Sequence, residues 1–226
     1  MGHSLYCGID EAGRGPVIGP MAVACIVVNE KAINALEKLG VRDSKTLLPS
    51  TRIKLYKRLG FIAEKVHVRI VSPPEIDKAV FGKTFKNLND LEAFMAASLI
   101  AEAYEPDVSK IFVDSPDINP ERYKLRILKH LNKLGLRVEP KKLICENKAE
   151  SKYVIVAAAS IIAKVRRDLI IEKLKTIYGD IGSGYPSDPV TREFLKRAIK
   201  AGKTPPIIRF SWKTLKRYGE YFAETL

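Results

Sequence analysis

The segment from Ser151 to Tyr178 constrains the fold more than any other part of this sequence. It is the longest helical segment of the chain, and the first half is apolar on nearly every side. A helix of this kind cannot face water, so it must lie buried between other elements. We therefore expect it to be the central helix of a layered core.

The rest of the chain indicates a strand hairpin followed by alternating helices and strands. Leu5–Asp10 and Met21–Val28 are short apolar segments separated by a glycine turn, which predicts the hairpin. Further strands are expected at Val66–Val71, Lys110–Asp114 and within Leu136–Cys145. This order predicts an α/β fold with a mixed central sheet flanked by helices, plus a helical C-terminal extension.

The charge favours a polyanionic partner. The chain carries 39 Lys and Arg against 26 Asp and Glu, a formal net charge of +13. Nucleic-acid-binding proteins are basic because they neutralise phosphates, although ribosomal and thermophilic proteins are also rich in Lys. We divide the chain into a core domain, 1–180, and a basic helical substrate-binding part, 181–226. Basic residues that crowd that part include Lys196, Arg197, Lys200, Lys203, Arg209, Lys213, Lys216 and Arg217.

Several other classes are disfavoured. No apolar run reaches the roughly 18 residues that a membrane helix needs, and the N-terminus lacks the basic start and apolar core of a signal peptide. We expect a cytoplasmic monomer with no membrane partner. Cys7, Cys25 and Cys145 have neither CxxC spacing nor a nearby His pair. We interpret them as small buried hydrophobes rather than metal or disulfide residues.

Acidic residues at strand ends are the candidate catalytic groups. Asp10 and Glu11 sit where an apolar strand gives way to a glycine turn, and Asp114 ends another strand. Consecutive strand side chains point to opposite faces, so Asp10 and Glu11 can serve one site only if the strand ends there. Glu150 precedes the central helix, where it can complement the helix dipole or reach the sheet end. A solvated turn is the alternative for Asp10 and Glu11.

Carboxylates that converge on one point repel one another unless cations bridge them. Hard oxygen ligands suit Mg²⁺ or Mn²⁺. Two such ions activate a water and stabilise the leaving oxygen in phosphodiester cleavage. The three histidines are scattered along the chain, so we do not expect any of them to take the catalytic role of the carboxylates.

Two turns are candidate ligand contacts. The turn at Gly13, Arg14 and Gly15 lets backbone groups approach a ligand closely, although a structural turn is the usual meaning of such a motif. Ser44 and Lys45 offer a hydroxyl and an ammonium group that suit a phosphate, or they cap a helix.

Three side chains of the second half are further candidates. Ser160 and Lys164 lie one helical turn apart on one face, where they serve the site or Lys164 merely reaches for solvent. Tyr185 lies in a Gly/Pro-rich loop, where it either stacks on a sugar or base or covers the core.

These motifs together resemble the type 2 ribonucleases H, ribonuclease HII, in an archaeal style. They occur in the order of that family over nearly the whole chain: Gly8–Pro16 with Gly19-Pro20, Asp43–Lys45, Val113-Asp114, Lys148–Tyr153, Ala158–Lys164, Gly182–Pro189 and Ser211–Thr214. An ordered set of this kind is far more specific than any single short motif.

The resemblance implies a ribonuclease H-like fold that hydrolyses RNA in RNA–DNA hybrids and incises duplex DNA 5′ of embedded ribonucleotides, leaving 3′-hydroxyl and 5′-phosphate ends. It implies that Asp10, Glu11 and Asp114 are catalytic metal ligands. It also implies that the Gly13–Gly15 turn contacts the ribose 2′-hydroxyl, which distinguishes RNA from DNA, and that Tyr185 packs on the deoxyribose that follows. We assign Arg209 and Lys213 to the basic substrate contacts.

Glu150 departs from the family pattern, which has Asp in a Lys-Ala-Asp context. The extra methylene of Glu moves the carboxylate unless the backbone compensates, and geometry near catalytic metals is tight. We expect Glu150 to remain a catalytic metal ligand, with an altered second metal site or a preference for Mn²⁺.

Two alternative functions remain open on these residues. One is a related nuclease that acts on branched DNA, such as a junction resolvase or an integrase-like protein. The other is a non-catalytic nucleic-acid-binding protein, which would bind through the basic C-terminal part and would not need Asp10.

Overall fold

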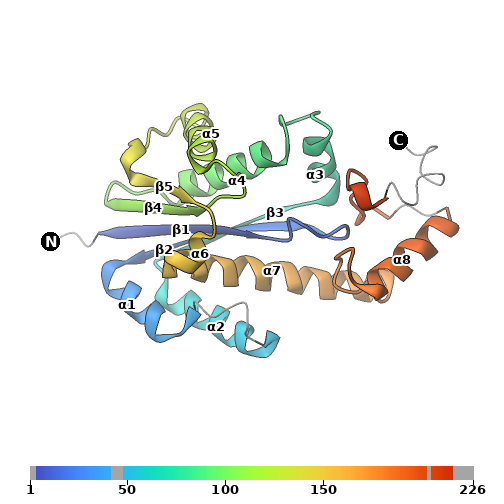
Figure 1. Cartoon of the computed structure of the whole chain (residues 1–226). Coiled ribbons are helices and arrows are strands. Elements are labelled where there is room, and N and C mark those ends of the chain that lie inside the picture. The colour runs from blue at the N-terminus through green and yellow to red at the C-terminus, as the bar shows by residue number, and fades with distance from the viewer. Residues whose placement is uncertain (1–3, 42–47, 203–204, 216–226) are drawn as a thin grey trace. The chain divides into compact units, whose positions relative to one another are not determined.

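The computed structural model describes residues 4–41, 48–202 and 205–215. Within these ranges, five strands form one sheet in the order β3-β2-β1-β4-β5 (Figure 1). The strands are β1 (Leu5–Ala12), β2 (Met21–Asn29), β3 (Lys65–Val71), β4 (Val108–Asp114) and β5 (Leu143–Glu146). β1 pairs antiparallel with β2 and parallel with β4, and β4 pairs parallel with β5. The predicted hairpin and mixed sheet are confirmed.

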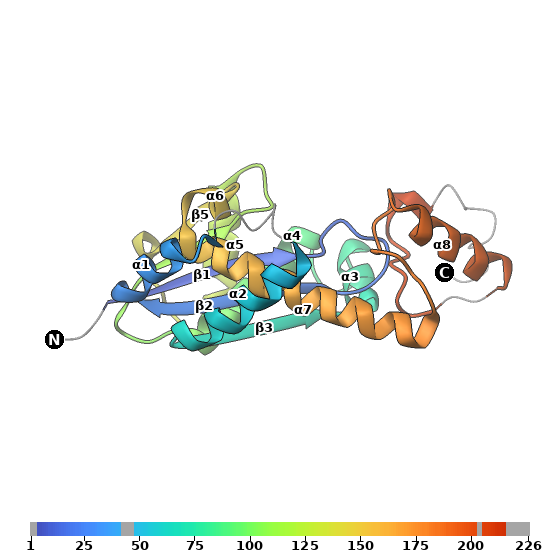
Figure 2. The same ribbon diagram turned by 90° about the horizontal axis from the view of Figure 1, so that it is seen from below.

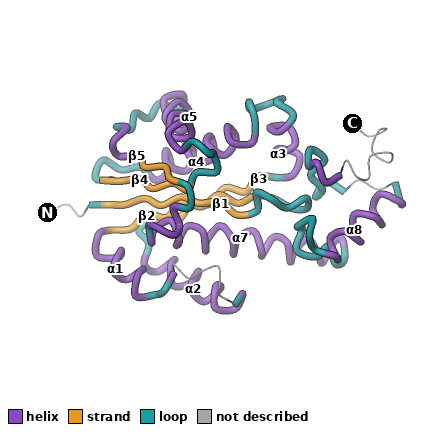
Figure 3. Tube along the Cα trace, in the orientation of Figure 1, coloured by secondary structure: helices purple, strands orange, loops and turns teal. Residues whose placement is uncertain are grey.

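Helices cover both faces of the sheet, as Figures 1 and 2 show. One face carries α4 (Leu88–Ala103) and α5 (Pro120–Lys133), and the other carries α1 (Glu30–Lys38), α2 (Pro49–Ile62) and α7 (Val154–Tyr178). Figure 3 shows the strands lying between these two helical layers. The α/β class expected from the sequence is therefore the observed one.

The first half of α7 is the buried central helix that the sequence predicts. Its residues from Val154 to Val165 share one hydrophobic core with Ala24, Ile26 and Val28 of β2. The helix approaches β1 most closely at Gly8, where a Cβ atom would lie 2.5 Å from the carbonyl oxygen of Ile155. Only a residue without a side chain fits between this strand and this helix.

Two local features differ from the sequence predictions. The expected helix from Ser151 to Tyr178 is divided into α6 (Ala149–Lys152) and α7, because the backbone of Tyr153 is extended. A helix that we did not predict, α3 (Pro73–Val80), begins directly after β3, and Ser72 and Glu75 form its capping box. The prolines end the strand as expected, but they also occupy the first helical turn, where proline is well tolerated.

The described part of the chain forms two compact units. The first lies within Met1–Ala12, Ala22–Arg69 and Asn89–Val165, and the second within Gly13–Met21, Ile70–Leu88 and Arg166–Leu226. The second unit has a core of its own, in which α8 (Pro189–Lys200) packs through Phe194 and Leu195 against Val17 and Ile18. The division into 1–180 and 181–226 stays a prediction. In the described ranges no helix has the length and apolar character needed to cross a membrane.

The close approach at Gly8 predicts a large penalty for a side chain there. Gly8→Ala should lower the free energy of unfolding by about 1–3 kcal/mol through overpacking. Gly60 of α2 is a matched control, because nothing lies within 4 Å of a Cβ atom at that position. Gly60→Ala should leave stability unchanged or raise it by up to about 1 kcal/mol. Urea denaturation of both variants tests this, and equal stabilities would contradict the packing argument.

Candidate active site

The candidate site lies where β1 and β4 stop pairing. Their parallel register ends at Ile9 and Val113, whereas β1 continues to pair with β2 as far as Ala12. The expectation that β1 ends at Asp10 is therefore wrong. Asp10 and Glu11 still belong to a strand, but β4 is no longer hydrogen-bonded beside them, and Asp114 ends β4 at the same level.

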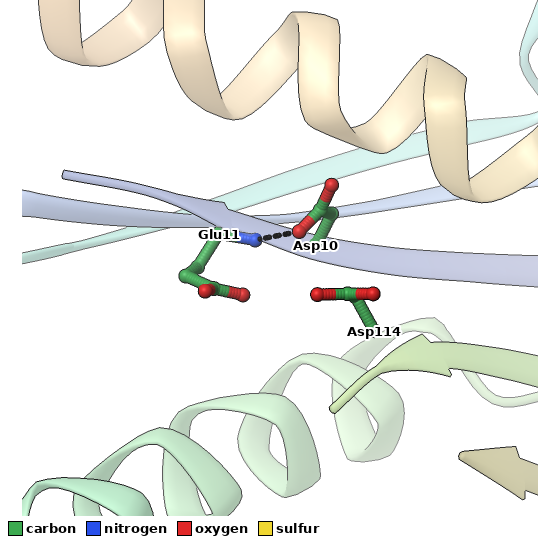
Figure 4. A group of neighbouring side chains, drawn as sticks. All are labelled: Asp10, Glu11 and Asp114. Atoms are coloured by element: carbon green, nitrogen blue, oxygen red, sulfur yellow. Dashed lines mark hydrogen bonds between the residues drawn. The ribbon is translucent and has the colours of Figure 1, made fainter. Parts of the chain in front are cut away.

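Three carboxylates gather at this opening. Oxygen atoms of Asp10, Glu11 and Asp114 lie within 4.8 Å of one another, and Figure 4 shows the three side chains together. Asp10 is buried, with 6% of its surface exposed, and Glu11 and Asp114 are half-buried. The backbone N–H of Glu11 donates to Asp10 Oδ1 at 2.7 Å, and the N–H of Ala149 donates to Asp114 Oδ1 at 2.7 Å.

Simultaneous ionisation of all three carboxylates is electrostatically unfavourable in this cluster. Burial, followed by the charges of Glu11 and Asp114, raises the pKa of Asp10 well above its ordinary value. Burial, followed by the charge of Glu11, raises the pKa of Asp114 to about 7. Both raised pKa values mean that the site favours a lower total negative charge. Protonation of a carboxylate or binding of a cation can lower that charge.

The donor set fits a hard divalent cation. All three groups offer carboxylate oxygens, the preferred ligands of Mg²⁺ and Mn²⁺, and a cation among them would relieve their repulsion. Neither histidine nor cysteine belongs to the group of three, so nothing in it favours a softer metal.

Glu150 lies beside the group of three. It is the second residue of α6, and both its charge and a hydrogen bond to Asp114 raise the pKa of that carboxyl. The turn before α6 is unusual, because Lys148 has a left-handed backbone with φ 55°. This turn sets the positions of both the Ala149 N–H and the Glu150 side chain. The role of Glu150 as a ligand stays a prediction.

Asn147 is a positioning residue that could not be selected from the sequence. Its side-chain Nδ2 donates to the carbonyl oxygens of Ser115, at 2.8 Å, and Asp117, at 2.7 Å. It thereby ties the turn after β5 to the loop that follows Asp114. A single polar residue in a turn carries no signal of such a contact, which depends on a partner about 30 residues away in the chain.

Asp117 lies in the same loop and has a structural role. Its side chain is buried and bonds to Arg122 and Arg126 of α5. The hydrogen bond from Arg122 is the main reason that the pKa of Asp117 is well below its usual range. The loop after Asp114 is thus fixed by Asn147 and by the two arginines of α5.

Ser160 and Lys164 are on the buried half of α7. The Ser160 hydroxyl is hydrogen-bonded to Asp10 and lowers the pKa of that carboxyl, against the larger effect of burial. Lys164, one turn further along the helix, is half-buried. The structure thus brings Ser160 to the acidic group, whereas a contact of Lys164 with substrate stays a prediction.

The Gly13–Gly15 turn belongs to the second unit, and its carbonyl groups are held there. The Arg209 guanidinium donates to the carbonyl oxygens of Gly13, at 2.6 Å, and Arg14, at 3.1 Å. The indole N–H of Trp212 donates to the carbonyl oxygen of Gly15 at 3.0 Å. Each carbonyl group of the turn therefore has a partner near the C-terminus of the described chain.

Arg209 is the predicted site residue whose surroundings differ most from our expectation. We expected Arg209 to contact the backbone of a nucleic acid, but its side chain is fully buried. It also donates to the carbonyl oxygen of Gly19 at 2.9 Å, and its guanidinium lies 4.8 Å from the centre of the Trp212 ring. The structure therefore gives Arg209 the task of holding the turn, which leaves it unavailable to a phosphate.

Tyr185 is partly exposed, and the guanidinium of an arginine packs against one face of its ring. Its side chain is 38% exposed, and the guanidinium of Arg167 lies 5.4 Å from the ring centre. Arg167 also donates to the carbonyl oxygen of Ser183, at 3.1 Å, in the loop that carries Tyr185. A Cβ atom on Gly15 would meet the Tyr185 ring at 3.6 Å, so the turn and the ring are neighbours.

The loop before α8 is fixed by Asp188, the N-cap of that helix. Asp188 accepts hydrogen bonds from the backbone N–H groups of Ser183, at 2.6 Å, and Val190, at 2.9 Å. The bonds from Ser183 are the main reason that the pKa of Asp188 falls to about 2. The backbone around Tyr185 is thus tied to the start of α8.

The remaining basic candidates are on the surface or outside the described residues. Lys213 is exposed, and α8 exposes Arg192, Lys196, Arg197 and Lys200. Ser44, Lys45, Lys203, Lys216 and Arg217 lie outside the described residues. Exposure leaves the basic side chains of α8 and Lys213 available to phosphates, and their contact with a substrate stays a prediction.

Sequence comparisons identify the family. The model of the family described as Ribonuclease HII matches residues 7–215 of the chain. A Ribonuclease HII of Thermofilum pendens is 48% identical over 212 residues, which cover 93% of this chain and 97% of that protein. A Ribonuclease HII of Pyrococcus horikoshii is 47% identical over 218 residues, which cover 95% and 93%.

Solved structures agree with the sequences. The ribonuclease H2 of Pyrococcus horikoshii OT3 superposes with a TM-score of 0.83 at 44% identity, covering 96% of this chain and 98% of that one. The RNase HII of Archaeoglobus fulgidus, solved as a complex with PCNA, gives a TM-score of 0.80 at 41% identity and covers 92% and 95%. The ribonuclease H-like fold is therefore confirmed. This chain belongs to the ribonuclease HII family of metal-dependent endoribonucleases.

Proposed function

We propose that this endoribonuclease, which cleaves the RNA strand of RNA–DNA hybrids, also incises duplex DNA on the 5′ side of single embedded ribonucleotides, acting as a monomer. The observation that carries the proposal is the turn at Gly13–Gly15, whose three carbonyl groups are all bound by Arg209 and Trp212. Recognition of one ribonucleotide requires contact with a single 2′-hydroxyl, and a fixed turn without bulky side chains suits that task.

The orientation of the peptide groups supports this role. In a trans peptide the C=O and the N–H point in opposite directions. Since Arg209 holds the carbonyl groups of Gly13 and Arg14, the N–H groups of Arg14 and Gly15 point away from that guanidinium. Gly15 is exposed and has no side chain to cover them. We propose that these groups bind the 2′-hydroxyl.

Tyr185 supplies the second half of the recognition. We propose that its exposed ring packs on the deoxyribose that follows the ribonucleotide, while Arg167 supports the opposite face. A sugar without a 2′-hydroxyl can approach an aromatic ring more closely than a ribose can. The turn would thus select the ribonucleotide, and Tyr185 the deoxynucleotide after it.

The chemical step is assigned to Asp10, Glu11, Asp114 and Glu150, which would hold Mg²⁺ or Mn²⁺. Such ions would supply activation of the attacking water and charge stabilisation of the leaving oxygen, and the products would carry 3′-hydroxyl and 5′-phosphate ends. The chain itself fixes the carboxylates, because Ala149 and Ser160 hold Asp114 and Asp10 by hydrogen bonds. Lys213 and the basic side chains of α8 would bind phosphates of the substrate backbone.

Gly15→Ala tests the recognition. The added methyl group would make only ordinary contact with Tyr185, so the thermal midpoint should not change, but it would occupy the space proposed for the ribose. We expect kcat/KM on a duplex with one ribonucleotide to fall about a hundredfold. Gly60→Ala should retain full activity.

Substrates and a catalytic variant separate this proposal from its alternatives. Asp10→Asn should reduce cleavage of every ribonucleotide-containing substrate by on the order of a thousandfold or more. Wild-type cleavage of branched all-DNA substrates in preference to the ribonucleotide duplex would favour a junction nuclease. Full activity of Asp10→Asn would overturn the assigned chemistry.

Asp114→Asn tests the metal site without an activity assay. Asn keeps the acceptor for the Ala149 N–H but removes a charge from the cluster. In EDTA, the variant should therefore unfold about 2–4 °C above the wild type, as expected for roughly 1 kcal/mol. With metal at a hundredfold excess over Kd, the wild type should gain about 5–10 °C and the variant much less.

Asp107→Asn is the matched control for this measurement, because Asp107 is exposed and lies directly before β4. It should follow the wild type with and without metal. An Asp114→Asn variant that still gains the full metal-induced shift would show that the cation binds elsewhere.

Glu150 requires a test of its own, since the family pattern has Asp there. Glu150→Ala should lower kcat by at least about tenfold and raise the metal concentration needed for half-maximal activity, because a carboxylate ligand is lost. Glu150→Asp should retain most activity and shift the ratio of Mg²⁺-supported to Mn²⁺-supported rates. Wild-type activity of Glu150→Ala would exclude Glu150 as a ligand.

A further inference from the structure

Cys7 and Cys25 form a close pair of sulfur atoms that the proposed function does not use. Their Sγ atoms lie 3.2 Å apart, and both side chains are almost completely buried. In the antiparallel register Cys7 is opposite Val27, and Cys25 is opposite Ile9. The two cysteines are therefore diagonal neighbours on one face of the sheet, because residues two apart on a strand share a face.

We propose that Cys7 and Cys25 are a dithiol–disulfide pair that closes into a cross-strand disulfide under oxidising conditions. The sulfur atoms already face each other, and they need to approach only from 3.2 Å to the roughly 2.05 Å of a disulfide bond. Diagonal neighbours have Cα atoms about 7–8 Å apart, so closing the bond requires the two strands to move slightly together as well as the side chains to turn, but the register of the hairpin stays the same. Neither cysteine carries another assigned task in the structure.

The oxidant is a small disulfide, and the exchange balances without any other reactant. One cysteine thiolate attacks the oxidant, forms a mixed disulfide and releases the first small thiol. The second cysteine thiolate then attacks the protein sulfur of that mixed disulfide and releases the second small thiol. In total, two protein thiols and one small disulfide give one protein disulfide and two small thiols.

Burial controls the rate of this exchange. A small disulfide cannot reach Cys7, at 3% exposure, or Cys25, at 0%, while β1 and β2 are packed. The exchange therefore requires local opening or takes place during folding. For the same reason a reductant cannot easily reach the bond once it has formed. The two cysteines therefore stay in the dithiol or disulfide form that they had when the strands last packed together.

A disulfide between Cys7 and Cys25 would stabilise the β1–β2 hairpin. It would close a loop over the tip of the β1–β2 hairpin, and this loop contains Asp10, Glu11 and the Gly13–Gly15 turn. A cross-link of this length restricts the unfolded chain and stabilises the folded one. We expect the thermal midpoint of the oxidised protein to rise by about 5–10 °C.

Thiol counting and mass spectrometry test the proposal on the full chain. The protein is incubated with oxidised glutathione near its unfolding midpoint, cooled and freed of oxidant. We expect the intact mass to fall by two hydrogens, the three thiols to decrease to one, and a peptide map to link Cys7 to Cys25. Dithiothreitol in denaturant should restore all three.

Cys145 provides the matched control. It is buried on β5, which β4 separates from β1 in the sheet. Cys145→Ala should form the same bond and show the same thermal shift, whereas Cys25→Ala should show neither. Three remaining thiols after oxidation, a bond that involves Cys145, or a linked protein with an unchanged or lower thermal midpoint would overturn the proposal.

Discussion

Mutual repulsion among Asp10, Glu11 and Asp114 is the constraint to which the first unit is adapted. Three carboxylates within 4.8 Å of one another, one of them buried, separate unless the surrounding backbone prevents it. The sheet provides two of the anchors, because Asp10 and Glu11 stay paired to β2 after β4 has left β1. A cation that bound there would find its oxygen ligands assembled in advance.

Helices also position two of the carboxylates, α7 through Ser160 and α6 through the Ala149 N–H. Gly8 lets α7 approach β1, and this brings Ser160 to Asp10. The turn between β5 and α6 presents the Ala149 N–H to Asp114, and Asn147 locks that turn to the neighbouring loop. The packing of the apolar helix and the geometry of the charged site are therefore parts of one arrangement.

The sequence was sufficient to predict the fold class and the three acidic residues that the structure brings together, because both have local signals. An apolar run leads into a carboxylate in both β1 and β4, at Asp10 and at Asp114, and an apolar helix must be buried. Arg209 had no such signal, since it looks like any other member of a basic run and its partner Gly13 is 196 residues away. The contact of Cys7 with Cys25 was also hidden, because it depends on the register of the hairpin. Roles that depend on long-range contacts could not be predicted in this way.

The buried guanidinium of Arg209 has a consequence for the strength of the turn as a donor. A carbonyl oxygen that accepts a bond from a cation draws electron density through its peptide group. The N–H at the other end of the same peptide then becomes more positive and binds an oxygen atom more strongly. Gly13 and Arg14 each share a peptide group with the next residue, so one charge polarises two neighbouring amides. A buried arginine would thus tune how strongly the backbone N–H groups of the turn attract an oxygen atom of a bound ligand.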